Sequence, residues 1–313
     1  MPKVWFEKCA KSCVVLFACE PFRGIAATLW ANFVNLKSGI FTVNRYENGE
    51  IHLDVQIPVN NQHCLILGSV SPPDAQLLST LLLAHSLKKD GARKVTLVLP
   101  YLAYARHDKD KLGQSMATAW IGSIFEASGC DDVICVDLHS KTAKQLFPIP
   151  LISISSAGVF AEAMKTHGLC GATIVAPDEG AIARCEAVKM AAGMPPGEIP
   201  YFEKHRTETG IVHTGPIGPV GSRAVIIDDI LDTGITLISA CEMLARAGVK
   251  EISVMVTHGL FTGDRWNRLW QIGVERIFCT DSVPRPANTD IDRIVTLSIV
   301  PLLESMLASF GDI

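Results

Sequence analysis

The stretch Arg223-Ala-Val-Ile-Ile-Asp-Asp-Ile-Leu-Asp-Thr-Gly-Ile-Thr-Leu-Ile-Ser-Ala240 decides the fold. Ala224 to Ile227 is a short apolar run rich in β-branched residues, which predicts a parallel strand covered on both faces. The run stops at Asp228 and Asp229, which we therefore expect at the carboxyl end of the strand, where open α/β sheets bind ligands. Because the apolar spacing from Leu237 through Leu244 is helical, the intervening residues are predicted to form a turn that opens a helix.

That turn is predicted to consist of Asp232, Thr233, Gly234, Ile235 and Thr236. A turn entering a helix directs unpaired backbone N–H groups at one point, and the threonine hydroxyls add donors, so it can hold a phosphate dianion. The carboxylates before it repel phosphate but accept hydrogen bonds from vicinal hydroxyls, or help to hold a cation. Turn and acids together predict a ribose 5-phosphate site. Solvated acids before a capped helix explain one aspartate, but they explain the whole set less well.

Length and composition indicate the general class of protein. A chain of 313 residues suggests two domains, and 48% hydrophobic with 19% charged residues indicates a globular protein with a large core. A net charge of -4 gives no electrostatic reason to expect a nucleic acid or an anionic membrane as partner. The ten cysteines contain no Cys-x-x-Cys pair, and no signal-peptide or membrane-spanning pattern is present. We therefore expect a cytoplasmic protein with reduced thiols.

Strand-like and helical segments alternate along the whole chain, which predicts the α/β class. In the first half, His63 to Val70 and Lys94 to Pro100 flank a helical stretch from Ala75 to Lys89, as in a right-handed βαβ unit. The second half repeats this pattern, so we predict two similar domains, each a mostly parallel sheet flanked by helices. Pro148 and Pro150 mark the predicted boundary. The predicted domains are 1–151 and 152–298, with a C-terminal helix at about 299–313 that packs back on the first.

Two segments of the first half carry residues suited to a nucleotide. In Arg45-Tyr46-Glu47-Asn48-Gly49-Glu50, the Asn-Gly pair favours a tight turn with positive φ. The aromatic ring can stack on a purine, but the local sequence alone favours an ordinary hairpin turn. Further on, Arg106 can hold a polyphosphate and His107, followed by Asp108, can contact a base. A charged surface loop is the alternative for this second segment.

Three further candidates come from strand ends and from one polar loop. His139 follows the predicted strand Asp132 to Leu138 and is as well suited to a cation or phosphate as to a backbone partner. Asp178 follows the strand Ala172 to Ala176, so it is expected near Asp228, where the two acids can share a sugar or Mg²⁺. Lys204 and Arg206 alternate in a polar segment and suit a transferring polyphosphate, with a solvated basic turn as the alternative.

The Asp228 to Thr236 stretch resembles the phosphoribosyl pyrophosphate (PRPP) binding motif of the type I phosphoribosyltransferase fold. Read with the other segments, the chain resembles the ribose-phosphate pyrophosphokinase (PRPP synthetase) family from Tyr46 to Pro284. The segments that carry this resemblance are Pro-Tyr-Leu-Ala-Tyr-Ala-Arg-His-Asp at 100–108, Val-Asp-Leu-His at 136–139, Ala-Pro-Asp-Glu-Gly at 176–180, Lys-His-Arg at 204–206 and Thr-His-Gly-Leu-Phe-Thr-Gly at 257–263.

The resemblance implies transfer of the β,γ-diphosphoryl group of ATP to the anomeric hydroxyl of ribose 5-phosphate, with Mg²⁺ as cofactor. It assigns ATP binding to Tyr46, Asn48, Gly49, Glu50, Arg106, His107 and Asp108, and metal binding to His139 and Asp178. It assigns ribose 5-phosphate binding to Arg206, Asp228, Asp229, Asp232, Thr233, Gly234, Ile235 and Thr236, and catalysis to Lys204 and Arg206. It also implies a homo-oligomer, as a dimer or hexamer.

Two other functions are compatible with parts of this pattern. A non-catalytic regulatory subunit keeps the fold and loses the loop chemistry, but the chain retains Lys204, Arg206 and His139. A phosphoribosyltransferase shares the stretch around Asp228 but lacks an ATP loop at Tyr46. The chain also departs from the family where Trp266 and Trp270 replace smaller residues, and the sequence offers no functional reason for them.

Overall fold

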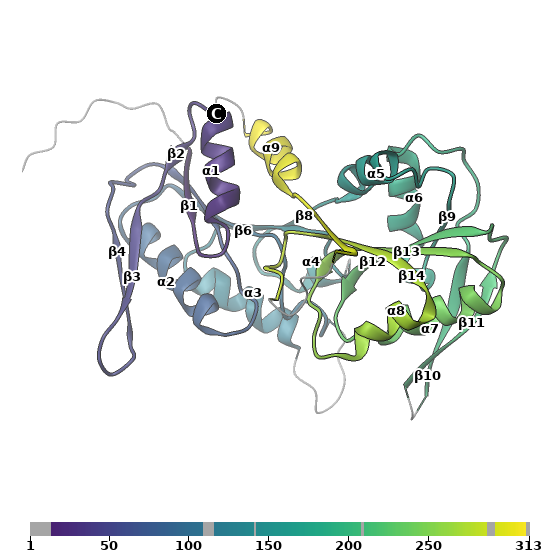
Figure 1. Ribbon diagram of the computed structural model, residues 1–313. Helices are drawn as coiled ribbons and strands as arrows, with labels where there is room; N and C mark the ends of the chain where they lie inside the picture. The colour runs from purple at the N-terminus through teal and green to yellow at the C-terminus, as the bar shows by residue number, and fades with distance from the viewer. Residues whose placement is uncertain (1–13, 109–115, 141, 208–209, 287–291, 311–313) are drawn as a thin grey trace, which may run out of the picture. The chain divides into compact units, whose positions relative to one another are not determined.

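The computed structural model describes residues 14–108, 116–140, 142–207, 210–286 and 292–310, with the side chains of residues 204–207 and 210–212 left outside that description. The chain forms two compact units, Met1–Ile154 with Leu303–Ile313, and Ser155–Leu302. Both units are α/β, as predicted (Figure 1).

The first unit is built on a six-stranded sheet in the order β2-β1-β5-β6-β7-β8. Every neighbouring pair in it is parallel. The central strands are almost wholly buried, which explains their continuous apolar sequences. The strands are β1 (Val14–Ala18), β2 (Lys37–Ser38), β5 (His63–Leu67), β6 (Lys94–Leu99), β7 (Asp132–Val136) and β8 (Leu151–Ile154).

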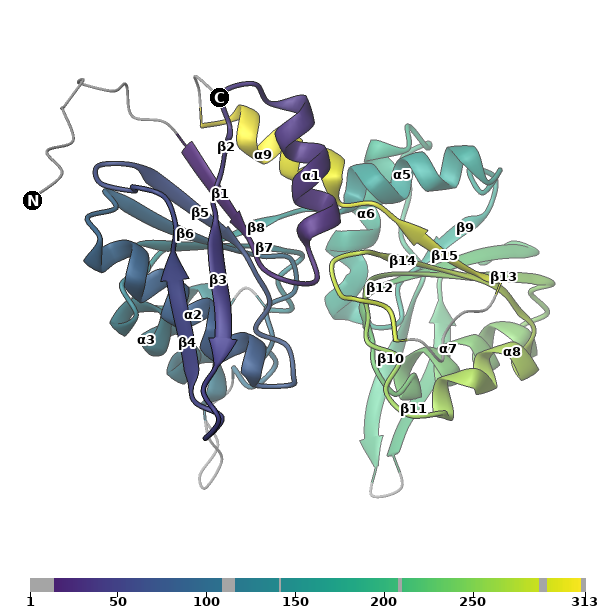
Figure 2. The same cartoon turned by 60° about the vertical axis from the view of Figure 1, so that its left-hand side comes forward.

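Helices cover both sides of this sheet. Figures 1 and 2 show α1 (Arg23–Asn32) beside α9 (Val300–Ala308), on the opposite side of the sheet from α2 (Ala75–Lys89) and α3 (Ala117–Ala127). The Asn32 amide donates to Glu304 Oε1 at 2.6 Å, which joins α1 to α9. A short α4 (Ala143–Leu146) precedes β8. A separate antiparallel hairpin, β3 (Phe41–Arg45) with β4 (Ile51–Val55), packs against α2.

The second unit contains a five-stranded parallel sheet in the order β15-β14-β13-β12-β9. Its strands are β9 (Thr173–Val175), β12 (Arg223–Leu231), β13 (Glu251–Gly259), β14 (Val274–Thr280) and β15 (Ile294–Leu297). An antiparallel pair, β10 (Tyr201–Thr207) and β11 (Gly210–Ile217), lies outside this sheet, and β11 packs on α7 (Ile235–Arg246).

Side chains along β12 alternate between two cores, because successive residues of a strand point to opposite faces. Ala224 and Ile226 belong to the core under α7 and α8 (Arg268–Ile272). Val225 and Ile227 belong to the core under α5 (Ala157–Thr166) and α6 (Ile182–Ala191). Burial on both faces therefore accounts for the apolar run that the sequence analysis began from.

Two predicted boundaries were wrong. The β12 strand does not stop at Ile227 but continues to Leu231, because β13 keeps pairing beside it as far as the Leu231 and Gly259 pair. The two acids are thus inside the last part of the strand. The strand predicted from Asp132 to Leu138 ends at Val136, because Asp137 has a positive φ of 41°.

The structure also bears on the predicted partners. None of the described helices combines the length and the apolar character needed to cross a bilayer.

The cysteines that the structure describes are all free thiols, as predicted. Burial raises the pKa of several of them, for example to about 12 for Cys135, so they remain protonated at neutral pH.

Candidate functional site

The carboxylates of the second unit gather at the carboxyl ends of two neighbouring strands. Asp228 and Asp229 lie near the end of β12, and the Asp229 N–H donates to Asp228 Oδ1 at 2.9 Å. β9 pairs with β12 up to the Val175 and Ile226 pair, so Asp178, three residues beyond β9, emerges at the same edge. The negative charge of Asp178 makes a small contribution to the raised pKa of the Asp228 carboxyl. The strand pairing thus brings the three acids to one edge of the sheet, as expected from the sequence.

Asp228 and Asp229 share Arg184 as a cationic neighbour. Arg184, in the first turn of α6, places its guanidinium 3.7 Å from Asp228 Oδ1 and 3.8 Å from Asp229 Oδ2. Burial and the adjacent charge of Asp229 raise the pKa of the Asp228 carboxyl well above its ordinary value, whereas Arg184 opposes that rise. Arg184 thus stabilises the ionised form of the Asp228 carboxyl, which burial disfavours.

The predicted turn does open a helix. Gly234 has φ +82°, a left-handed conformation, and α7 begins at the next residue. No described side chain caps the start of α7. The first N–H groups of a helix have no intrahelical acceptor, so this end of α7 has the character of an anion site.

Gly234 is also required because of its surroundings. A Cβ atom added to it would lie 2.9 Å from the Cα and 3.0 Å from the Cβ of Trp266. The backbone of the short 3-10 turn Arg265–Asn267 therefore lies directly behind the predicted phosphate loop.

In the first unit, the predicted ATP residues Tyr46 to Glu50 form the tip of the β3-β4 hairpin. The Tyr46 N–H donates to the Glu50 carbonyl at 2.9 Å, and Gly49 has φ +90°, as the Asn-Gly pair predicted. Asn48 Oδ1 accepts a hydrogen bond from the Glu50 N–H at 3.1 Å. The Tyr46 ring is 57% exposed, so an aromatic face is available for stacking on a base.

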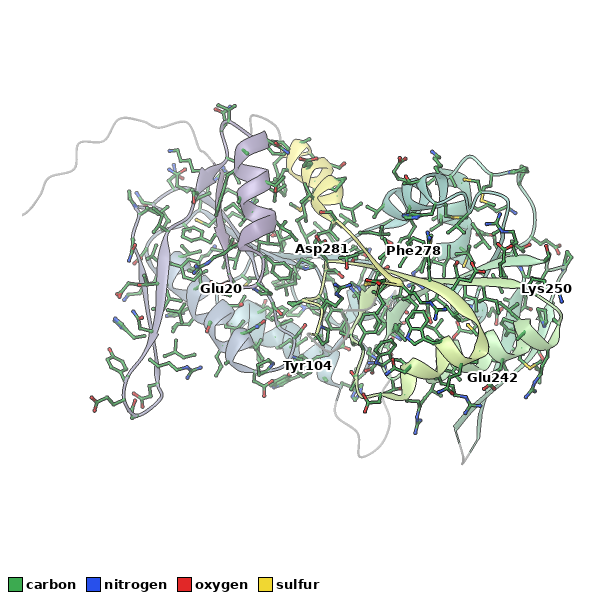
Figure 3. The ribbon with its side chains drawn as sticks, in the orientation of Figure 1. Glu20, Tyr104, Glu242, Lys250, Phe278 and Asp281 are labelled. Atoms are coloured by element: carbon green, nitrogen blue, oxygen red, sulfur yellow. The ribbon has the colours of Figure 1, made fainter. Side chains whose placement is uncertain are left out.

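Arg106, His107 and Asp108 lie in a loop after β6. The buried Thr118 hydroxyl lies 3.0 Å from the Tyr104 carbonyl and 2.9 Å from the His107 carbonyl, so it joins both ends of this loop. Tyr104, labelled in Figure 3, has φ +68°, and its hydroxyl donates to Asp74 at 2.9 Å. These contacts leave Arg106 and His107 exposed on a braced loop.

The remaining predicted residues are less fully described. His139 is exposed, three residues beyond the end of β7. Lys204 and Arg206 lie in β10, opposite His213 and Ile211 of β11, but their side chains lie outside the described residues. Among the side chains that are described, no group of three or more His, Cys, Asp or Glu residues forms a metal cluster.

Sequence reasoning missed Arg184 and Thr118, and it singled out Trp266 without finding a function for it. Arg184 follows Asp178 by six residues, and its place at the start of a helix that leaves the acidic strand end was the one available signal. Thr118 acts through a hydroxyl that contacts two carbonyl groups distant in sequence. Trp266 approaches Gly234 through its backbone, which no residue pattern reveals.

Comparison with solved structures identifies the class of fold. The crystal structure of phosphoribosylpyrophosphate synthetase from Mycobacterium smegmatis matches with a TM-score of 0.83, covering 96% of this chain and 99% of that one at 23% sequence identity. The chain thus has the PRPP synthetase fold, with two α/β units that are each built on a parallel sheet.

Sequence comparison identifies the family. A family profile described as the N-terminal domain of ribose phosphate pyrophosphokinase matches residues 14–129, and one described as the phosphoribosyl synthetase-associated domain matches residues 198–308. The ribose-phosphate pyrophosphokinase of Bacillus caldolyticus is 28% identical over 292 residues, which cover 92% of this chain and 91% of that protein. Ribose-phosphate pyrophosphokinase 1 of Streptococcus pyogenes is 27% identical over 296 residues, with the same coverage. The chain belongs to the ribose-phosphate pyrophosphokinase family.

Proposed function

We propose that this protein is a ribose-phosphate diphosphokinase, which makes PRPP and AMP from ATP and ribose 5-phosphate. The observation that carries the proposal is the left-handed Gly234 turn at the start of α7, directly after the acids of β12. Family membership narrows the ligand of this turn to a pentose 5-phosphate and separates the chain from ordinary phosphoribosyltransferases.

Each part of the second unit then has a defined task. The Asp232 to Thr236 turn, including Thr233 and Ile235, binds the 5-phosphate through backbone N–H groups and hydroxyls. Asp228 and Asp229 accept hydrogen bonds from the sugar hydroxyls. Arg184 lies between the two acids and neutralises part of their charge.

The first unit supplies the nucleotide contacts. Tyr46 stacks on the adenine, and Asn48, Gly49 and Glu50 form the rim of that contact. Arg106 holds phosphate oxygens, with His107 and Asp108 beside it. In the reaction, the anomeric oxygen forms a bond to the β-phosphorus, the bond from the β-phosphorus to the oxygen retained by AMP breaks, and the hydroxyl proton is lost. Lys204 and Arg206 neutralise the charge of the transferring group.

Mg²⁺ is the cofactor that this chemistry implies. Asp178 and Asp228 are hard oxygen donors at one edge of the sheet, and Mg²⁺ typically binds one or two carboxylates, substrate phosphates and water. His139, in the first unit, is a further candidate metal ligand. When bound, Mg²⁺ neutralises polyphosphate charge and orients the diphosphoryl group.

The test is an AMP-release assay on the purified full chain. ATP, Mg²⁺ and ribose 5-phosphate together should yield AMP and PRPP in equal amounts. Replacing ribose 5-phosphate by ribose should abolish the product, because the turn recognises the 5-phosphate. No AMP from protein that still binds both substrates would leave the regulatory-subunit alternative, and consumption of PRPP with a free base would indicate a phosphoribosyltransferase. Light scattering after size exclusion checks the homo-oligomer that we also propose.

A further inference from the structure

The turn from Asp232 to Thr236, called the phosphate turn below, is held by backbone hydrogen bonds from the segment that follows β13. The Leu260 and Phe261 N–H groups donate to the Leu231 carbonyl at 2.8 and 3.1 Å, and the Thr262 N–H donates to the Asp232 carbonyl at 3.2 Å. The beginning of the turn is therefore fixed by backbone hydrogen bonds. Its middle residue, Gly234, lies against Trp266 instead.

Trp266 is itself held in an aromatic stack. It is 1% exposed, and its ring meets Phe261 at 4.9 Å and Trp270 at 6.2 Å between centroids, both edge to face. Arg293 lies over Trp270, with its guanidinium carbon 4.4 Å from the ring centroid, and also donates to the carbonyls of Val274 and Glu275. The stack thus runs from the start of β14 to the back of the phosphate turn.

The indole N–H of Trp266 is buried and has no hydrogen-bond partner among the described residues. Its contribution is therefore the shape of the ring and the position it imposes on the backbone, since a buried donor without an acceptor is unfavourable in itself. The Trp266 backbone lies so close to Gly234 that a side chain at residue 234 would not fit, and a retreat of this backbone would leave a cavity behind the turn.

We propose that Trp266 is a positioning residue for the sugar phosphate: it fixes the Gly234 turn in its anion-binding shape and so sets affinity for ribose 5-phosphate without setting affinity for ATP. The inference rests on the proposed function, because it takes ribose 5-phosphate as the ligand of the turn. Trp266 contacts the turn residue Gly234 and is assigned no contact with the substrate.

The test compares Trp266→Leu with Phe278→Leu. Phe278, labelled in Figure 3, is an equally buried aromatic residue of the same unit, but it belongs to the core under α5 and α6, whereas Trp266 belongs to the core under α7 and α8. Both variants lose core packing, so both should unfold at lower temperature. Only Trp266→Leu should raise KM for ribose 5-phosphate, by roughly tenfold, while KM for ATP stays within about twofold.

Trp266→Phe provides the milder variant if Trp266→Leu does not fold. Because the indole N–H meets no acceptor in the described part of the chain, a smaller aromatic ring without this group should recover part of the affinity for ribose 5-phosphate. An unchanged KM for ribose 5-phosphate in a folded Trp266 variant, or an equal rise in Phe278→Leu, would overturn the inference. Calorimetry on the wild-type protein separates this inference from the proposed diphosphokinase activity. If the wild-type protein binds ribose 5-phosphate but releases no AMP, the proposed reaction is contradicted, while the role of Trp266 in binding can still be tested.

Discussion

The guanidinium of Arg184 lies 3.7 Å from a carboxylate oxygen of Asp228. Both side chains are largely buried, and Asp229 adds a second negative charge within reach of the same guanidinium. Because removing one partner of a buried ion pair leaves an uncompensated charge, we expect Arg184→Ala to lower the free energy of unfolding by roughly 3 kcal/mol at neutral pH. Denaturant unfolding measures this.

A double-mutant cycle shows whether that loss comes from the carboxylate. Arg184→Ala should cost clearly less in an Asp228→Asn background than in the wild type, because one of the repelling charges is then absent. Arg184→Lys keeps the cation and should retain most of the stability. Equal losses in both backgrounds would mean that Arg184 acts through packing alone.

Gly234→Ala should damage the phosphate turn in two ways. An alanine at φ +82° costs about 1 to 2 kcal/mol, and its Cβ would lie 2.9 Å from the Trp266 backbone. We expect affinity for ribose 5-phosphate, measured by calorimetry, to fall by roughly tenfold or more. Gly273→Ala is the matched control, because Gly273 has φ +102° and nothing within 4 Å of an added Cβ. Gly273→Ala should lower the free energy of unfolding by a similar amount but leave the affinity for ribose 5-phosphate unchanged. If both variants lost affinity equally, the contact between Gly234 and Trp266 would not be what maintains the binding site.

The sequence predicted the turn from Asp232 to Thr236, but it did not predict which residues hold that turn and the nearby acids in place. The strand, the acids, Gly234 and the helix are consecutive in sequence, so their hydrophobic pattern and backbone preferences are local properties. Trp266 and Arg184 act from 32 and 44 or more residues away from these groups, through packing that no periodicity encodes. The end of β12 was misjudged for the same reason, because the length of a strand depends on the pairing offered by its neighbour, here β13. The hairpin at Tyr46 was read correctly as a hairpin because Asn48-Gly49 is a local turn signal.

Lys204→Ala should lower turnover by about two orders of magnitude or more while ribose 5-phosphate still binds. A cation that neutralises the transferring group contributes mainly to the transition state. AMP release measures turnover, and calorimetry measures ribose 5-phosphate binding. Lys250→Ala, at the exposed residue before β13 that Figure 3 labels, removes the same charge elsewhere in the same unit and should have little effect. A near-normal rate in Lys204→Ala would remove Lys204 from the proposed role.

Thr118→Val tests the loop that carries Arg106 and His107. The substitution keeps the shape of the buried side chain but removes the hydroxyl that contacts the Tyr104 and His107 carbonyls. Loss of these contacts should destabilise the ordered conformation of the loop by about 1 kcal/mol. This should raise KM for ATP about fivefold and leave KM for ribose 5-phosphate unchanged. Ser123→Ala, on the same helix, removes a hydroxyl that donates to the Ala119 carbonyl within the helix, and it should change neither constant. A parallel rise in both KM values for Thr118→Val would point to general loosening of the first unit.

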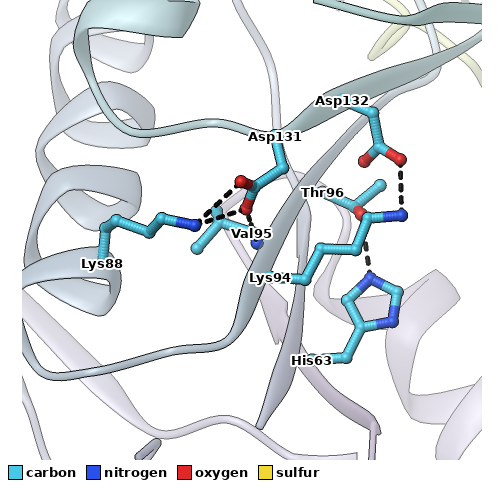
Figure 4. A network of polar contacts seen from close by, with 7 residues as sticks. All are labelled: His63, Lys88, Lys94, Val95, Thr96, Asp131 and Asp132. Atoms are coloured by element: carbon cyan, nitrogen blue, oxygen red, sulfur yellow. Dashed lines mark hydrogen bonds and ion pairs between the residues drawn. The ribbon is translucent and has the colours of Figure 1, made fainter. Parts of the chain in front are cut away.

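His63 should make stability depend on pH between about 4 and 6.5. Figure 4 shows its ring bonded to the Thr96 hydroxyl, with Nε2 2.9 Å from that oxygen, beside the pair formed by Lys94 and Asp132. Burial and then the charge of Lys94 lower the pKa of His63 from 6.5 to about 4. Between those values the unfolded chain binds a proton that the folded chain does not, so stability falls as the pH decreases.

Acidification from pH 7 to pH 4 should therefore remove about 3 kcal/mol of unfolding free energy through this residue alone. His63→Gln keeps a hydrogen-bonding side chain beside Thr96 but cannot titrate, so its stability should fall less over the same range. His85→Gln, at an exposed position on α2, is the control and should follow the wild type. Urea unfolding at several pH values gives the comparison. If His63→Gln and the wild type lose stability in parallel, other groups carry the acid sensitivity and the buried imidazole does not.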